Sequence, residues 1–344
     1  MKMIIGNFSA GFSNHDWNPV MTADTANLSY WLNWRFLVCA IFVLIAMVVA
    51  AVLIWKHEGF GKSRKGKHED HEEEIVGTVN IDDCWKTSSE SIHAGWLLGY
   101  RLIALCILVA LLLSEAIVNG ARIFYFYTEW TFTLITIYFG LASAFSVYGC
   151  LHHWKAVGDG RADFDKRDAE RGNYMPPLEG VGVPDMLGTL NSRDEPHNPK
   201  AAGFGGYTLQ ILYQVCAGAV ALTDIVYWLI IYPFLTNADY KLRFLVICMH
   251  TVNAVFFLGE LVLNRLQFPL FRIAYFALWT SVFVIFQWII HMCVSLWWPY
   301  PFLDLSSQYA PIWYLAVGLL HLPCYCMFPL ILRAKQFCLS RFNP

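Results

Sequence analysis

Seven apolar runs, each long enough to cross a lipid bilayer, occupy most of this sequence. A transmembrane helix needs about 20 predominantly apolar residues, and the runs reach that length at 35–55, 96–118, 124–150, 208–235, 242–263, 271–295 and 311–332. Hydrocarbon offers no water to the backbone, so each segment has to satisfy its own peptide groups, as an α-helix does. The sequence therefore predicts an all-α, polytopic membrane helix bundle with seven transmembrane helices.

Composition supports a membrane protein and argues against other classes. The chain is 57% hydrophobic and only 15% charged, whereas soluble domains have about 45–50% apolar and about 25% charged residues. Its net charge is −2 and it has no basic stripe, so we expect no nucleic-acid partner. The ten cysteines form no CxxC pair, and most fall inside apolar runs, where cysteine behaves as a small hydrophobe. We expect neither a disulfide scaffold nor a metal site nor a cofactor.

Lysine and arginine residues set the expected direction of insertion. With the N-terminus outside, the cytosolic segments 56–95, 151–207 and 264–270 and the C-terminal tail hold 18 of the 24 basic residues, counting the ends of adjoining spans. The glycosylation tripeptides NFS at Asn7 and NLS at Asn27 then lie in the external arm. We expect an external N-terminus and a cytosolic C-terminus, in a multi-pass protein of the endoplasmic reticulum or the plasma membrane.

This topology divides the chain into five parts. They are an external arm (1–34), a first transmembrane anchor (35–55), a charged cytosolic linker (56–95), a six-helix membrane core (96–332) that includes the cytosolic loop 151–207, and a cytosolic tail (333–344). The first 34 residues are polar and contain no small-residue cleavage site. We therefore expect 35–55 to stay as an anchor rather than to be removed as a signal peptide.

Ionisable side chains inside the spans mark candidate sites, because they are costly in lipid and usually face a bundle interior or a wet cavity. The candidates are Glu115, Glu129, Asp224, His250, Glu260, His291 and His321. Thr128 lies a few residues into the third span and His250 further into the fifth, and both spans run inward in this topology. At 1.5 Å per residue, His250 lies roughly 12 Å below the outer boundary and Thr128 slightly shallower. The two can therefore share one layer of the bundle.

Two features near span ends fit the membrane interface. Arg101 is close to the start of the second span, where its long side chain is expected to snorkel toward water. The aromatic cluster FYFY at 124–127 is typical of an interfacial belt.

Thr128 and His250 also have the chemistry of a nucleophile and a base. A threonine hydroxyl is a weak nucleophile until a neighbouring base takes its proton, and a neutral imidazole accepts that proton near pH 7. Acyl transfer also needs donors for the developing oxyanion, for which Asn253 and Thr131 are candidates. Spacing leaves structural roles open, since an intramembrane histidine commonly bonds across helices and a threonine commonly bonds its own i−4 carbonyl.

Three stretches resemble a known family. The sequences RIFYFYTEWTFTL at 122–134, VICMHTVNAVFFLGELVLNR at 246–265 and WWPYPFLDL at 297–305 resemble the androgen-induced family of multi-pass membrane hydrolases and the related rolling stone proteins. The resemblance runs from about Trp96 to the end of the chain. It implies a threonine hydrolase of fatty-acid esters of hydroxy fatty acids that uses one intramembrane threonine and one intramembrane histidine.

The resemblance carries these roles onto particular residues. Thr128, in FYT, corresponds to the family's threonine, and His250, in MHT, corresponds to its histidine. Glu260 matches an acid downstream of that histidine, and Tyr300 belongs to the loop that reads Tyr-Pro-Phe-Leu in the family.

The chain departs from the family at several positions. Val246 stands where an asparagine is usual, Glu129 and Trp130 stand where apolar residues are usual, and the loop 151–207 is longer. The first span has no counterpart in the resemblance.

We expect an intramembrane lipid-ester hydrolase in which Thr128 attacks the acyl carbonyl and His250 acts as the base. The substrate is expected to be a membrane lipid that enters from the bilayer. Substrate-binding or supporting roles are expected for Glu129, Thr131, Asp224, Asn253 and Tyr300.

Three other functions remain open at this stage. The first is a non-enzymatic, rolling stone-like membrane interaction protein. The second is a seven-helix receptor, although the third span ends without an Asp-Arg-Tyr motif. The third is a transporter, although the sequence shows neither an inverted repeat nor paired broken helices.

Overall fold

The computed structural model describes residues 23–58, 80–89, 91–171, 203–236 and 241–342. Its elements in chain order are α2 (Leu28–Trp31), α3 (Trp34–Glu58), η1 (Ile81–Cys84), α4 (Ala94–Asn119), η2 (Gly120–Tyr125), α5 (Tyr127–Arg171), α6 (Gly203–Val226), η3 (Tyr227–Leu235), α7 (Phe244–Met249), α8 (Val252–Leu263), η4 (Leu270–Arg272), α9 (Ile273–Cys293), η5 (Pro301–Leu303) and α10 (Ala310–Phe342). The element η3 is a π-helix, and the other η elements are 3₁₀-helices. The described residues contain no strand beyond an isolated bridge between Thr87 and Asn264.

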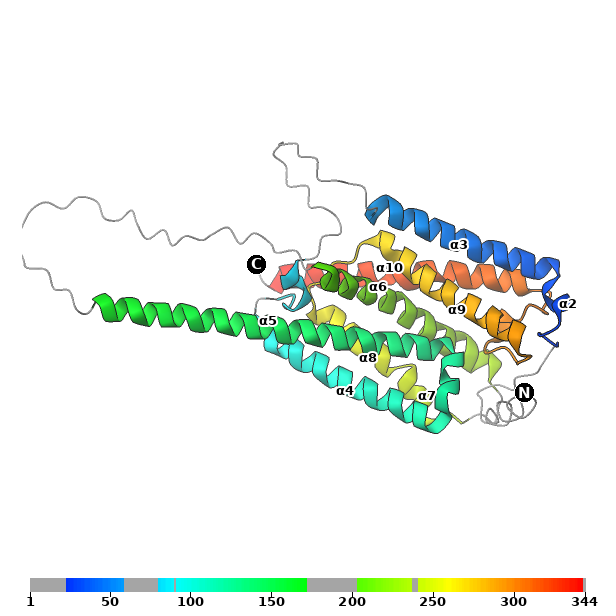
Figure 1. Ribbon diagram of the computed structural model, residues 1–344, viewed down its shortest axis with the longest axis horizontal. Helices are drawn as coiled ribbons and strands as arrows, with labels where there is room; N and C mark the ends of the chain where they lie inside the picture. Colours follow the sequence, from blue (N-terminus) through cyan, green and yellow to red (C-terminus); the bar gives the residue numbers. More distant parts are fainter. Residues whose placement is uncertain (1–22, 59–79, 90, 172–202, 237–240, 343–344) are drawn as a thin grey trace, which may run out of the picture.

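Seven helical segments are long and apolar enough to span a membrane, and they run side by side in one bundle (Figure 1). They are Trp34–Glu58, Ala94–Tyr125, Tyr127–Trp154, Gly203–Leu235, Phe244–Leu263, Leu270–Cys293 and Ala310–Arg341. Each overlaps one of the seven predicted runs, so the prediction of an all-α, multi-pass membrane bundle is confirmed. The helix α2 lies at one end of this bundle, called the α2 end below, and α10 finishes at the other (Figure 1).

The helix α6 is the centre of the bundle. In its most apolar stretch 67% of the residues are buried, compared with 11% in α3 and in α4. Small residues between Cys216 and Ala221 let neighbouring helices approach closely. A Cβ atom at Gly218 would overlap the ring of Phe276 on α9, so this crossing requires glycine. The helices α3 and α4 present mostly exposed apolar side chains, as lipid-facing helices do.

Two predicted boundaries differ from the structure. The helix α5 continues to Arg171, so the predicted loop 151–207 begins as a helix, because extending an existing helix costs far less than nucleating one. The end of the predicted linker 56–95 also packs on the bundle rather than standing in solvent. There Cys84 is buried, and the Ser88 amide donates to the Leu263 carbonyl at 2.9 Å.

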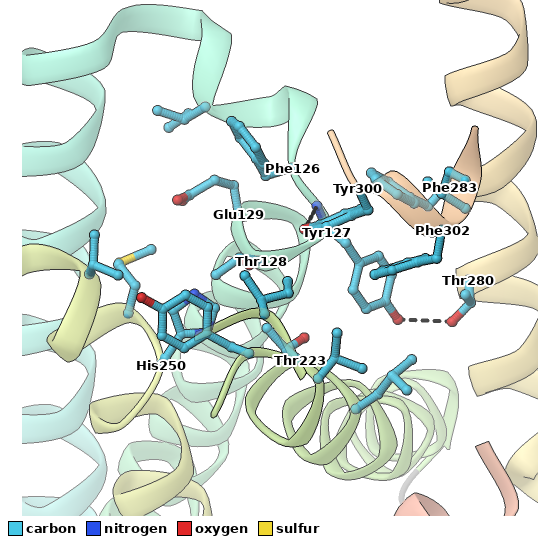
Figure 2. A pocket seen from close by; sticks show the side chains of 18 of the residues that line it. Phe126, Tyr127, Thr128, Glu129, Thr223, His250, Thr280, Phe283, Tyr300 and Phe302 are labelled. Carbon is cyan, nitrogen blue, oxygen red and sulfur yellow. Dashed lines mark hydrogen bonds between the residues drawn. The ribbon is translucent and has the colours of Figure 1, made fainter. Parts of the chain in front are cut away.

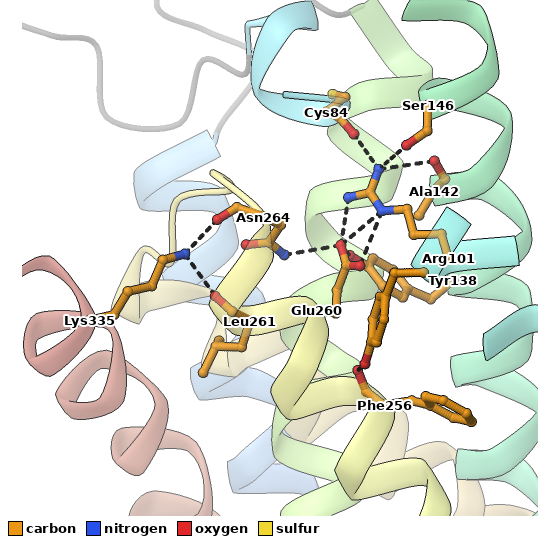
Figure 3. Close-up of polar contacts among 11 residues, drawn as sticks. Cys84, Arg101, Tyr138, Ala142, Ser146, Phe256, Glu260, Leu261, Asn264 and Lys335 are labelled. Carbon is orange, nitrogen blue, oxygen red and sulfur yellow. Dashed lines mark hydrogen bonds and ion pairs between the residues drawn. The ribbon is translucent and has the colours of Figure 1, made fainter. Parts of the chain in front are cut away.

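A buried ion pair joins the helices at the end opposite α2 (Figure 3). Arg101 and Glu260 have no exposed side-chain surface and lie 2.5 Å apart. Arg101 also donates to the Ser146 hydroxyl at 2.6 Å, and Tyr138 donates to Glu260 at 2.8 Å. The prediction that Arg101 snorkels is therefore wrong: its guanidinium turns inward because a carboxylate, a hydroxyl and two carbonyl oxygens satisfy it there.

The helix α3 is tied to the rest of the bundle at both of its ends. At one end, Glu58 pairs with Arg272 at 2.7 Å and accepts hydrogen bonds from Tyr207 and Tyr275. At the α2 end, the Arg35 guanidinium donates to the Ser306 carbonyl at 2.9 Å. These contacts hold α3 against α9 and α10, which matters for the cavities described below.

Candidate functional site

A cavity of about 170 Å³ lies near the α2 end of the bundle, between η2, the start of α5, the end of α6, α7, α9 and η5 (Figure 2). Four of the predicted site residues line it: Thr128, Glu129, His250 and Tyr300. All four are buried. Segments far apart in the sequence therefore bring a threonine, a carboxyl group, an imidazole and a phenol to one cavity.

Thr128 stands in the first turn of α5. The preceding helix α4 ends at Asn119 and is capped by Gly120, whose φ of 66° lies in a region that glycine adopts without strain. The chain then turns through η2 and enters α5 at Tyr127. Thr128 thus lies at a helix N-terminus, where backbone N–H groups lack helical partners and the helix dipole favours negative charge.

Tyr300 caps this N-terminus. Its hydroxyl accepts a hydrogen bond from the Tyr127 amide at 3.0 Å and also interacts with the side chain and backbone of Thr128. Burial raises the pKa of Tyr300 to about 12, against the opposing effect of these hydrogen bonds. The phenol therefore keeps its proton at neutral pH.

His250 lies at a break in the fifth span. The helix α7 ends at Met249 and α8 begins at Val252, so His250 and Thr251 fall outside both helices. Non-helical backbone at membrane depth is tolerated where it is buried in protein or lines a cavity. Trp228 compensates for part of the break by donating from its indole N–H to the His250 carbonyl at 2.7 Å.

The prediction of one unbroken helix at 242–263 is wrong, because the structure divides this span into α7 and α8. The stretch contains neither proline nor glycine near His250, the usual marks of a helix break. Tertiary contacts, including the hydrogen bond from Trp228, favour the break. Because these contacts come from outside the span, the sequence of the span itself does not predict the break.

The π-helix η3 places an aromatic ring on His250. Pro233 lies inside this element, and proline removes a backbone hydrogen bond from a helix; π-turns are frequent at functional sites. Tyr227, the first residue of η3, stacks on the imidazole with ring centroids 3.7 Å apart and planes 5° from parallel. The stack fixes the plane of the His250 ring.

Asp224 approaches the same imidazole from α6. Its Oδ1 lies 3.6 Å from Nδ1 of His250, slightly beyond hydrogen-bond distance. Within the described residues, His250 Nδ1 and Asp224 Oδ2 are buried without a hydrogen-bond partner, which is unusual for polar atoms. Asn253 donates to Asp224 Oδ1 at 3.3 Å. Because Nδ1 faces Asp224, Nε2 is the ring nitrogen left for the cavity.

Ionisable side chains also line the cavity. Glu129 is 6% exposed, and its Oε2 has no hydrogen-bond partner among the described residues. Arg243, by contrast, is exposed and lines the same cavity. The cavity therefore extends from the protein surface to a buried carboxyl group.

Thr128 and His250 share the cavity but are not hydrogen-bonded to each other in the part of the chain that the structure describes. The side chain of Thr128 faces Tyr300 instead. Hydrogen bonds of catalytic groups are often long or absent without substrate.

Glu115, an ionisable candidate of the second span, also lines the cavity, whereas Thr131, Asp224 and Asn253 lie outside its lining. Thr131 contacts the Thr223 hydroxyl at 3.2 Å and so joins α5 to α6. Asn253 holds Asp224 and also accepts from the Ala254 amide at 2.8 Å at the start of α8. Their positions suit support of the site rather than contact with a substrate.

Tyr127 and Tyr227 line the cavity, although neither was predicted from the sequence to be a site residue. Tyr227 had no signal beyond its aromatic character. Tyr127 was assigned to an interfacial belt with its neighbour Tyr125, but both are buried. Tyr127 contacts the Thr280 hydroxyl at 2.9 Å, and Tyr125 contacts His291 at 3.0 Å. These aromatic side chains turn inward because polar partners inside the bundle satisfy their hydroxyl groups.

The other sequence predictions concern sites away from the cavity. No group of three or more His, Cys, Asp or Glu residues suited to a metal ion occurs among the described residues. Asn27 is exposed and caps α2 by accepting from the Ser29 amide at 3.1 Å. Asn7 lies outside the described residues.

Comparisons of the chain with protein-family models, with curated proteins and with solved structures gave no match.

Proposed function

We propose that this chain is an intramembrane lipid-ester hydrolase, with Thr128 as nucleophile and His250 as general base. The observation that carries the proposal is the shared cavity: a threonine at a helix N-terminus and a histidine at a helix break line the same space. A carboxylate behind the histidine, Asp224, adds the third member of a nucleophile–base–orienter set.

The first step forms an acyl-enzyme. Thr128 turns from Tyr300 toward His250, its hydroxyl proton moves to Nε2, and Oγ bonds to the acyl carbon of the ester. The carbonyl oxygen becomes an oxyanion. The Tyr300 hydroxyl, which interacts with Thr128 at the start of α5, is the donor that we assign to that charge, because a donor fixed in a water-poor site stabilises an oxyanion strongly.

The second step releases the alcohol. The tetrahedral intermediate collapses, the bond between the acyl carbon and the alcohol oxygen breaks, and the imidazolium of His250 gives its proton to that oxygen. Water then attacks the acyl group on Thr128 with His250 as base. The carboxylic acid leaves, Thr128 regains its proton, and no cofactor is consumed.

Asp224 orients the base. An Nδ1–H of His250 that points at Asp224 fixes the tautomer with Nε2 unprotonated, and the carboxylate stabilises the imidazolium formed in each step. Asn253 holds Asp224 Oδ1 from the other side. A small closure of the 3.6 Å separation completes this hydrogen bond.

The substrate class is an acyl lipid in the surrounding bilayer. The cavity is mostly apolar yet contains charged groups, which suits an ester with long hydrocarbon arms and a polar end. The motif resemblance points to fatty-acid esters of hydroxy fatty acids. With the C-terminus cytosolic, the α2 end and the site lie in the leaflet that faces away from the cytosol, which is the lumenal leaflet of the endoplasmic reticulum or the outer leaflet of the plasma membrane.

Fatty-acid release by the purified chain in lipid nanodiscs tests the proposal. Thr128→Ala and His250→Ala are expected to abolish hydrolysis of a long-chain branched ester. Thr136→Ala is the matched control, because Thr136 is on the same helix, donates to the Phe132 carbonyl at 2.8 Å and does not line the cavity. Equal activity in Thr128→Ala and Thr136→Ala excludes Thr128 as the nucleophile.

A transporter is the second candidate, and the break at His250 beside the buried Asp224 favours it. Transporters commonly bind substrate at broken helices near ionisable groups. Transport of a small ion into proteoliposomes would be lost in Asp224→Asn and retained in Thr128→Ala. Hydrolysis of an ester by the wild type, lost in Thr128→Ala, favours the hydrolase instead.

A further inference from the structure

A second cavity, of about 420 Å³, lies between α3, α9 and α10. Its wall is almost entirely apolar, with Thr280, Ser281 and His321 among its few polar side chains. The hydrogen-bonding groups of these side chains are engaged within the protein: Ser281 donates to the Ala277 carbonyl at 2.8 Å, and His321 contacts the Val317 carbonyl at 2.8 Å and the Thr280 hydroxyl at 2.9 Å. The wall therefore suits a hydrocarbon chain and offers little to a polar ligand.

The second cavity adjoins the cavity of Thr128. Both are lined by Thr280, Val284, Phe302, Leu303 and Val317. The Thr280 hydroxyl contacts the Tyr127 hydroxyl on one side and His321 on the other, at 2.9 Å each. One thin partition thus separates the two spaces, and Thr280 belongs to both.

The volumes suit different parts of one molecule. Cavities that hold a whole small ligand measure about 300–1,000 Å³, and the 170 Å³ beside Thr128 is below that range. It has room for an ester group and adjoining atoms, but a second long arm needs additional space. The 420 Å³ of apolar space behind the partition provides it.

We propose that the second cavity is a subsite for the hydrocarbon arm on the alcohol side of the ester cleaved at Thr128. This inference rests on the proposed hydrolase function. The arm crosses the partition beside Val284 and Phe302, which line both cavities. The ester carbonyl then stays at Thr128 while one arm occupies the groove along α3.

The second cavity is expected to change the position of the bound ester rather than its binding affinity. A lipid tail in the bilayer is already surrounded by hydrocarbon, so moving it into an apolar groove gains little. Holding the arm in one direction, however, fixes the carbonyl relative to Thr128, and a misplacement of about 1 Å can lower a rate about 10²-fold. The second cavity should therefore affect turnover of two-armed esters and leave one-armed esters unaffected.

The helix α3 makes this subsite particular to the present chain. Phe42, Val43, Ala46, Val49, Ala50 and Leu53 line it at helical spacing. The span that contains them has no counterpart in the motif resemblance, which begins at about Trp96. The contacts of Glu58 and Arg35 hold α3 in place at both ends, so the groove has a fixed wall.

Gly318→Leu tests the subsite by filling it. Gly318 lines the second cavity, and a Cβ atom there meets no heavy atom within 4 Å. Gly99→Leu is the matched control, since Gly99 on α4 also has open space at its Cβ and lines neither cavity. Ala46→Phe fills the groove from the opposite wall, with the exposed Val48→Phe on the same helix as its control.

The readout is kcat/KM for two esters with the same acyl chain, one with a long alcohol arm and one a methyl ester, in nanodiscs. We expect Gly318→Leu and Ala46→Phe to lower kcat/KM about tenfold or more for the long-armed ester only, with both controls at wild-type values. The subsite is overturned if both filling variants keep the wild-type ratio of kcat/KM between the two esters while Thr128-dependent activity is intact. The groove is then a place for bilayer lipid and not for the substrate. Absence of Thr128-dependent hydrolysis of either ester overturns the hydrolase function itself.

Discussion

The imidazole of His250 lies face to face with the phenol ring of Tyr227, with centroids 3.7 Å apart and planes 5° from parallel. Asp224 Oδ1 lies 3.6 Å from Nδ1 of the same imidazole. The stack sets the plane of the ring, and the carboxyl group sets which nitrogen faces the cavity. Together they fix the orientation of the imidazole that we propose as the general base.

Tyr227→Leu should lower kcat about tenfold with a smaller change in KM, because the imidazole loses the surface that fixes its plane. Tyr227→Phe keeps the ring and should keep most of the activity. Steady-state kinetics on both variants, with thermal unfolding as a check on folding, measure the effect. Equal losses in the Phe and Leu variants would show that the stack does not position the base.

Asp224→Asn should lower kcat by about 10²-fold or more, because an amide can hold His250 in the wrong tautomer. Asn253→Ala should cost less, about tenfold at most, because Asn253 acts on Asp224 and not on the base. The comparison is made by single-turnover hydrolysis in nanodiscs. If Asp224→Asn stays within twofold of the wild type, Asp224 is a packing residue.

Tyr300→Phe should lower kcat about 10²-fold with little change in KM, since the phenol proton is needed only when the oxyanion forms. The raised pKa of Tyr300, about 12 because of burial, keeps that proton in place at working pH. The wild-type pH–rate profile should therefore show no loss of activity from this phenol below about pH 10. A wild-type kcat in Tyr300→Phe would limit Tyr300 to capping α5.

The Arg101–Glu260 pair should dominate stability at the end opposite α2. Arg101→Met and Glu260→Met each leave a buried charge unpaired and should destabilise the fold by about 3–5 kcal/mol. The double variant should recover much of that loss, because removing both charges removes the desolvation cost. Thermal unfolding in one detergent measures all three, and simple additivity of the two losses would contradict the coupling.

The seven spans were predictable from the sequence because membrane thickness fixes the length of an apolar helix. The ends of the spans were less predictable. The polar sequence after Cys150 predicted a loop, but α5 runs to Arg171. Apolar residues identify the part of a helix that lies inside the bilayer. The part that continues into water is polar, so the apolar pattern does not predict where such a helix ends.

The site was predictable only in part. The depths predicted for Thr128 and His250 placed them in one layer of the bundle, and in the structure both residues line one cavity. The helix break at His250, the stack of Tyr227 and the inward turn of Arg101 depend on partners distant in sequence; Glu260 is 159 residues from Arg101. Such contacts arise from helix packing, which spacing along one helix does not describe.

The most direct measurement for the central claim is the location of a covalent adduct. The purified chain is treated with a lipid-like fluorophosphonate, which traps an activated nucleophile, and the modified peptide is identified by mass spectrometry. The account predicts one adduct on Thr128 Oγ in the wild type and in Thr136→Ala, and none in His250→Ala. An adduct on another residue, or undiminished labelling of Thr128→Ala, would contradict it.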